Sequence, residues 1–290
     1  MIKENKKELI ICLLAVACLI LSGHNYNPAA YIMMGLKVYH IFLVLFLIIT
    51  IIAMTGPLKK FKKSFSLLLM WSGGFSLVEV IYTYTSYLLP PEGSSLWMFI
   101  VTFYQYIGII ILFLAFYSNK ESFSKSFLKP GNLKEETKVL GYKEAIPWYM
   151  VVLRFFIAFI SCFVIFLIIR KAWANCSIAS LKLFIPILLA SLSIGLAEEI
   201  LCRGIFLGVF LQEMSERKAN ILQAFLFGLL HWPSHTFLFY LQKVLLFTFL
   251  GWFFGRAAME TKGILPSFIM HSTIIVGLNA TMYLFGVPAF

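Results

Sequence analysis

Long apolar segments recur along the whole chain and leave little sequence between them. They cover roughly residues 9–22, 40–56, 64–89, 96–117, 148–169, 181–211, 219–234, 236–255 and 264–285. A helix needs about 20 residues to cross the hydrocarbon core of a bilayer. Most of the segments reach that length, and only the first and the seventh are clearly shorter. The sequence therefore predicts an all-α, polytopic bundle of eight or nine transmembrane helices.

The composition indicates that lipid surrounds most of the chain. Of the 290 residues, 61% are hydrophobic and 13% are charged, whereas a soluble domain is about half apolar and about a quarter charged. A water-soluble fold of this size cannot hide so much apolar surface, so we expect the lipid bilayer to be a partner of the chain. The five cysteines form no CxxC pair, which argues against a disulfide framework or a thiolate zinc site.

Positive charge is concentrated between the apolar segments. The net charge is +11, with four lysines within 59–63 and six within 118–147, whereas 90–95 has no lysine or arginine. Because basic loops stay on the cytoplasmic side, the pattern predicts a cytoplasmic N-terminus, with the loop near 170–182 as the exception. This topological role accounts for the charge, so we expect no nucleic-acid partner.

Apart from Lys182 at its edge, the apolar segment 181–211 contains three charged side chains, namely Glu198, Glu199 and Arg203. A charge at the centre of a membrane helix costs at least about 2.5–3.5 kcal/mol, so such residues are candidates for function. On an α-helix Glu199 and Arg203 share a face and can pair. Glu198 points about 100° away from Glu199, which leaves it available as a general base. A purely structural ion pair is the alternative interpretation.

Two histidines, His231 and His271, lie on two later apolar segments. A single buried histidine is more often a packed residue than a ligand. Together with the two glutamates and the arginine, however, the pair provides a base, charge partners and oxyanion donors for a hydrolytic reaction. Glutamate and histidine also suit a divalent metal such as zinc. A zinc site of the HExxH type is not expected, because Pro233 separates His231 from His235 and the glutamate is missing.

These residues form three motifs that resemble those of the CAAX-protease and bacteriocin-processing family, often labelled Abi. Glu198, Glu199 and Arg203 match its EExxxR motif, Phe227 and His231 match FxxxH, and His271 takes the place of the histidine in HxxxN/D. The resemblance covers about residues 180–285. It divides the chain into N-terminal transmembrane helices with a cytoplasmic linker, 1–147, and a catalytic transmembrane core, 148–290.

The resemblance implies a role for each residue of the motifs. Glu198 together with His231 would activate water, and Glu199 and Arg203 would orient and neutralise the site. His271 would stabilise the oxyanion. The family has been described both as metalloproteases and as metal-independent glutamate proteases, so Glu198, His231 and His271 would be the ligands in a metal-dependent enzyme.

One position departs from the family pattern. Ile275 stands where the family has asparagine or aspartate, and Asn279 lies about 80° around the helix from His271. Loss of one oxyanion donor can reduce the rate by about 10²–10³. The sequence thus allows a slow protease, a protease with altered geometry or an inactive relative.

We expect an intramembrane endopeptidase that cuts a membrane-associated or lipidated peptide or protein. The resemblance implies prenylated CAAX C-termini, bacteriocin or pheromone precursors, or a role in bacteriocin immunity, in a bacterial cell membrane. The alternatives are a catalytically weak or inactive membrane regulator or scaffold, motivated by Ile275, and a transporter, since buried charges also mark ion paths. No inverted repeat supports the transporter. No residue selects the substrate or the oligomeric state.

Overall fold

The computed structural model describes residues 10–14, 44–45, 47–52, 55, 59–71, 85, 88–90, 94–117, 126–138, 143–175, 181–231 and 237–286. These residues fall into two compact units. The first unit contains 202–256 and the described parts of 1–81 and 110–126. The second contains 127–201, 257–286 and the described part of 82–109. Helix α5 (Ser95–Tyr117) contributes residues to both.

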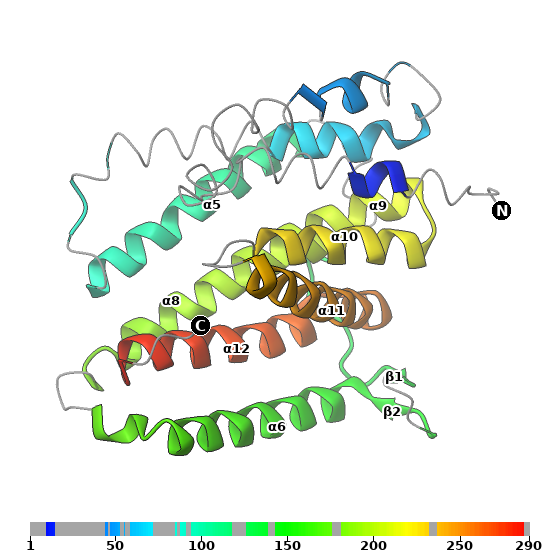
Figure 1. The fold of residues 1–290 in the computed structure, drawn as a ribbon. Coiled ribbons are helices and arrows are strands. Elements are labelled where there is room, and N and C mark those ends of the chain that lie inside the picture. Colours follow the sequence, from blue (N-terminus) through cyan, green and yellow to red (C-terminus); the bar gives the residue numbers. More distant parts are fainter. Residues whose placement is uncertain are drawn as a thin grey trace. The chain divides into compact units, whose positions relative to one another are not determined.

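The second unit is built on three long helices. These are α6 (Trp148–Ile169), α8 (Phe184–Glu199) and α12 (Leu265–Tyr283). Helix α12 lies between the other two and packs against both (Figure 1). Proline lies at two of the helix starts, and its fixed φ suits the first turn of α12. Pro147 precedes α6, and Pro266 lies in the first turn of α12.

Short elements complete this unit. Strands β1 (Glu136–Thr137) and β2 (Ile146–Pro147) pair antiparallel just before α6, with Glu136 opposite Pro147. A short 3-10 helix, η4 (Ala172–Asn175), follows α6. Trp148 is fully buried at the start of α6, and its indole N–H donates to a Glu260 carboxylate oxygen at 3.0 Å.

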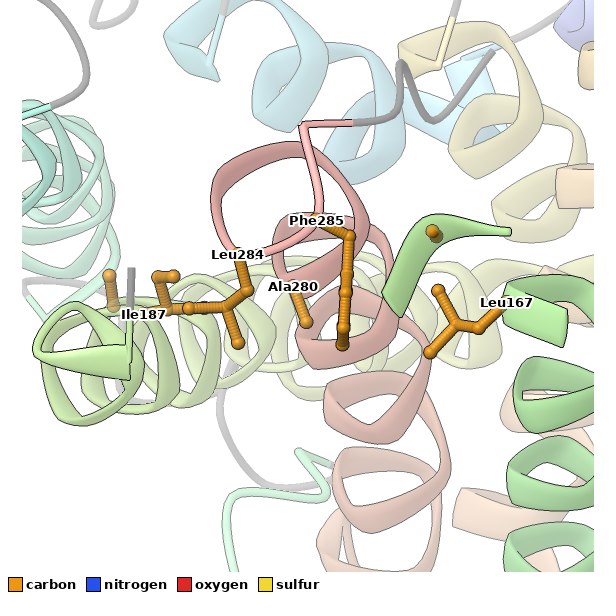
Figure 2. Close-up of a cluster of buried hydrophobic side chains, with 7 residues drawn as sticks. Leu167, Ile187, Ala280, Leu284 and Phe285 are labelled. Atoms are coloured by element: carbon orange, nitrogen blue, oxygen red, sulfur yellow. The ribbon is translucent and has the colours of Figure 1, made fainter. Parts of the chain in front are cut away.

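A hydrophobic cluster joins the C-terminal ends of α6 and α12 to the first half of α8. Figure 2 shows Ile187 and Leu284 on one side of Ala280, with Phe285 and Leu167 on the other. Such clusters stabilise a membrane protein by van der Waals packing, since lipid tails are as apolar as the side chains themselves. The cluster therefore anchors α12 to α6 and α8 at the end away from His271.

The first unit contains most of the remaining described elements. In chain order they are the 3-10 helix η1 (Lys59–Phe61), the π-helix η5 (Ile200–Leu207), α9 (Gly208–Glu213), α10 (Glu216–Leu230) and α11 (Phe237–Thr261). The first two residues of η5 and the last five of α11 belong to the second unit. Residues 62–71 are also helical. Glu213 holds the start of that helix: its carboxylate accepts the backbone N–H of Lys63 at 2.6 Å and that of Ser64 at 2.8 Å. A carboxylate at a helix N-terminus satisfies amides that lack an intrahelical partner.

Three helices of the described residues are long and apolar enough to cross a bilayer: Trp148–Ile169, Phe184–Glu213 and Leu265–Tyr283. Helix α6 exposes large apolar side chains along its length, among them Leu153, Ile157 and Ile165, as expected of a helix that faces lipid. The predicted helical membrane protein is thus confirmed. The count of eight or nine transmembrane helices stays a prediction, and the first apolar segment and the Trp232–Pro233 break lie mostly outside the described residues.

Candidate active site

The EExxxR motif lies where the helix changes its type. Helix α8 ends at Glu199, and the chain continues as the π-helix η5 from Ile200, so Arg203 lies on a wider turn than an α-helix has. π-Helical turns are rare and occur frequently at functional sites. The change falls between Glu199 and Arg203, so the two residues are not related by a regular α-helical turn, and their pairing stays a prediction.

Glu199 and His271 form the central contact of the second unit. His271 Nδ1 lies 2.9 Å from Glu199 Oε1, and both side chains are fully buried. With the Glu199 carboxylate as the acceptor, His271 Nδ1–H is the donor of this hydrogen bond. A hydrogen bond to a charged group is stronger than a neutral one, and this one fixes the orientation of the imidazole between α8 and α12.

Glu198 approaches the other ring nitrogen of the same histidine. Its Oε2 lies 3.5 Å from His271 Nε2, and 27% of its side chain is exposed, against 0% for Glu199. His271 is therefore held between two carboxylates, one at each nitrogen. Of the two glutamates, only Glu198 is accessible enough to meet water or a substrate.

Arg203 lies in an aromatic pocket of the first unit. Its guanidinium carbon lies 4.2 Å from the ring centroid of Phe227 and 5.3 Å from that of Phe254, and the side chain is fully buried. A desolvated cation over an aromatic ring gains about 2 kcal/mol. Arg203 Nη2 also lies 3.5 Å from the carbonyl oxygen of Gly251, which accepts a 2.7 Å bond from Gln223 as well. Two aromatic rings and the carbonyl group of Gly251 thus surround the guanidinium.

His231 terminates α10 in the same unit. Its Nδ1 lies 2.8 Å from the carbonyl oxygen of Phe227. A carbonyl oxygen only accepts, so Nδ1 carries the proton and Nε2 has the lone pair. The ring stacks on Phe247 at 3.7 Å between centroids and meets the edge of Phe227 at 4.6 Å. This tautomer suits His231 as a base or as a metal ligand through Nε2.

Phe227 contacts two other residues of the motifs. Its ring contacts both Arg203 and His231, and its backbone carbonyl sets the tautomer of His231. The sequence motif predicts no contact for Phe227, and Phe247 lies outside the three motifs. A phenylalanine within an apolar helix carries no sequence signal that separates it from an ordinary core residue.

Asn279 is engaged away from His271. Its side-chain amide donates to the hydroxyl of Ser191 at 2.9 Å, eight residues before Glu199 on α8. Ile275, one helical turn after His271, is apolar and half-buried. The amide that the family carries at position 275 therefore has no counterpart in Asn279, which ties α12 to α8 two turns further along.

The histidine and glutamate of the second unit also suit a metal ion. Tetrahedral zinc with ligand distances of about 2.0–2.2 Å places two ligand atoms about 3.4 Å apart, and Glu198 Oε2 and His271 Nε2 are 3.5 Å apart. Zinc-binding histidines commonly donate a hydrogen bond from their other ring nitrogen to a carboxylate, and His271 Nδ1 makes such a bond to Glu199. An ion pair between Glu198 and a protonated His271 fits the same distance without metal, so both forms of the site stay open.

Comparison with known proteins identifies the segment that carries the site. Residues 180–276 match the family model described as type II CAAX prenyl endopeptidase Rce1-like. The matched segment includes all of the candidate site residues: Glu198, Glu199, Arg203, His231 and His271. Neither the curated proteins nor the solved structures contain a significant match.

Proposed function

Residues 180–276 belong to the CAAX-protease and bacteriocin-processing family, and from this premise we propose that the chain is an intramembrane endopeptidase that hydrolyses a peptide bond of a membrane-associated or lipidated substrate. The family match implies a CAAX-type intramembrane protease. It favours neither the regulator nor the transporter. One observation supports the proposal most strongly: His271 is buried between Glu199 and the accessible Glu198.

The proposed reaction begins with water. Glu198, together with His231 through its Nε2 lone pair, takes a proton from the water, and the resulting hydroxide attacks the carbonyl carbon of the scissile bond. The oxyanion that forms accepts a hydrogen bond from Nε2–H of His271, which carries a proton on both ring nitrogens in this metal-free form of the site. The C–N bond then breaks, and the proton returns to the leaving amine. Glu199 keeps the imidazole of His271 in position throughout.

A zinc ion, if the enzyme uses one, would be held by Glu198, His231 and His271. When bound, such an ion activates water and polarises the carbonyl group of the substrate. The contact between Glu199 and His271 serves the same purpose with or without the ion, because it fixes the ring and the tautomer of His271.

The substrate and the cellular setting are part of the same proposal. Prenylated CAAX C-termini and bacteriocin or pheromone precursors are the substrate classes that the resemblance implies. The chain would lie in a bacterial cell membrane with a cytoplasmic N-terminus. A membrane-embedded site suits such substrates, because a lipid anchor delivers the peptide to the bilayer that surrounds the enzyme.

Cleavage in liposomes tests this function. Wild type, Glu198→Gln and a control, Glu216→Gln at the exposed start of α10, would be reconstituted and incubated with lipidated and leader-bearing peptides. We expect mass spectrometry to show one cleaved bond with wild type and the control, and a rate at least about 10²-fold lower with Glu198→Gln, as for loss of a general base. Equal cleavage by Glu198→Gln would refute the mechanism. Inhibition by a chelator, reversed by added zinc, would select the metal-dependent form.

A further inference from the structure

We propose that Phe247, on α11, is a positioning residue for His231, because its ring fixes the plane of the imidazole and thereby the direction of the Nε2 lone pair. This inference rests on the proposed protease function and adds to it a residue outside the three motifs. The observation that supports it is the stacking of the two rings: the centroids of His231 and Phe247 are 3.7 Å apart, and their planes differ by 8°.

His231 needs such external support because of its place in the helix. It caps α10 with φ −90° and ψ 9°, outside regular helical geometry, and its backbone N–H bonds back to the carbonyl of Gly228 at 3.2 Å. The side chain therefore projects from the C-terminal end of the helix. The bond from Nδ1 to the Phe227 carbonyl sets one direction of the ring, and it leaves the ring able to tilt about that bond.

The stack on Phe247 removes this remaining freedom. Phe247 is buried, and its ring also meets that of Phe227 at 6.2 Å with an interplanar angle of 66°. The imidazole thus has Phe247 against its face and Phe227 against its edge. One hydrogen bond and two aromatic contacts together define a single ring orientation.

Close packing of α10 and α11 makes the position of Phe247 rigid. A Cβ atom at Gly228 would lie 2.6 Å from the carbonyl oxygen of Val244, and a Cβ atom at Gly251 would lie 3.0 Å from the Cα of Ala224. Small residues allow membrane helices to approach in this way. Phe247 lies between Val244 and Gly251 on the contacting stretch of α11, so backbone contacts on both sides set where its ring lies.

The orientation matters because the lone pair of Nε2 lies in the plane of the ring. A tilted ring directs it away from the water that it must deprotonate, and small misplacements of reacting groups can cost about 10²-fold in rate. We expect Phe247→Leu and Phe247→Met to lower kcat by about 10–100-fold with KM nearly unchanged. Phe247→Tyr keeps a stacking ring and should retain activity.

The same variants allow a test that does not depend on activity. In nanodiscs, full-length protein with ¹³C-labelled histidine would give a His231 signal, assigned by its loss in His231→Gln. A ring that stacks on phenylalanine has an upfield-shifted Cε1–H signal. We expect this shift in wild type, in Phe247→Tyr and in the control Phe210→Leu, which shortens another buried ring of the same unit, and its loss in Phe247→Leu and Phe247→Met.

Three experimental results distinguish a failure of the Phe247 proposal from a failure of the protease function. An unshifted His231 signal in wild type would overturn the proposal, because the stack would not exist. A shift that is lost in Phe247→Met while kcat stays at the wild-type value would also overturn it, because the stack would then serve packing alone. If the shift is present but wild type cleaves no peptide of the panel, the protease function fails and Phe247 loses its positioning role with it.

Discussion

At the scale of single residues, the imidazole of His271 contacts two neighbouring glutamates, one at each ring nitrogen. Its Nδ1 is bound by the fully buried Glu199, and its Nε2 faces the accessible Glu198 at 3.5 Å. Adjacent residues on an α-helix point about 100° apart, yet one imidazole reaches both because its two nitrogens lie on opposite sides of the ring. Glu199 is fully buried against this imidazole, whereas 27% of the Glu198 side chain is exposed.

Position 275 offers the sharpest prediction at this scale. Replacing Ile275 by asparagine places an amide one helical turn after His271, where the family has a polar residue. Because one oxyanion donor contributes about 10²–10³ in rate, we expect Ile275→Asn to raise kcat by about tenfold or more. The measurement is the initial rate of peptide cleavage in liposomes.

The neighbouring isoleucine provides the control. Ile274 is also half-buried but points about 100° away from position 275 on the same helix. The variant Ile274→Asn adds the same amide to α12 and should leave kcat unchanged or lower. If both variants accelerate cleavage equally, or neither does, position 275 does not limit the rate.

At the scale of secondary-structure elements, the contact between α8 and α12 depends on a missing side chain. Gly195 lies one turn before Glu199, and a Cβ atom there would overlap the hydroxyl of Ser272, the residue next to His271. The Ser272 hydroxyl is buried and has no hydrogen-bond partner among the described residues. The registry that brings His271 to Glu199 therefore relies on the close approach of the two helices at Gly195.

A double-mutant cycle measures this contact. Gly195→Ala should destabilise the protein by about 1–3 kcal/mol through overpacking and lower activity, because α12 shifts away from Glu199. Adding Ser272→Ala should restore most of the loss, since the remaining Ser272 atoms lie 3.4 Å from the new Cβ, an ordinary contact. Thermal unfolding in detergent and cleavage rates would be measured for all four proteins. Additive effects of the two substitutions would show that Gly195 and Ser272 do not interact.

At the scale of the whole molecule, the residues of the motifs are shared between two compact units. Glu198, Glu199 and His271 belong to one, and Arg203 and His231 to the other. The helical stretch from α8 through η5 to α9 runs from the second unit into the first, and the π-helix lies at that transition. Each unit thus contains one of the two histidines together with its contacts. His271 is bound by the carboxylate of Glu199, and His231 by a backbone carbonyl group and a stacked phenylalanine ring.

The membrane orientation gives a prediction for the whole chain. Lys134 is exposed in the basic loop before α6, and Ser94 precedes α5 next to a loop without cations. In a background without the native cysteines, we expect Lys134→Cys to react with a membrane-impermeant maleimide only in inside-out vesicles. The control Ser94→Cys should react only in intact cells. The reverse pattern would contradict a cytoplasmic N-terminus, because the positive-inside rule assigns both loops.

Local sequence predicted the three membrane-length helices of the described residues. The apolar segment 148–169 coincides with α6, and 264–285 exceeds α12 by only one residue at the start and two at the end. Length and composition decide whether a segment crosses the bilayer, because unpaired backbone groups cannot remain in lipid. Charged and imidazole side chains inside such segments stand out for the same reason, since their cost in lipid is high.

Tertiary structure alone decided which of these side chains meet. That Glu199 binds His271, that Phe227 and Phe247 hold His231, and that Asn279 binds Ser191 all depend on the registry of packed helices. Registry is set by contacts between residues far apart in sequence, such as those at Gly195 and Gly228, and no local pattern encodes them. The sequence by itself therefore determined the membrane-spanning elements and the chemical groups, whereas the packing of the helices determined the pairs that these groups form.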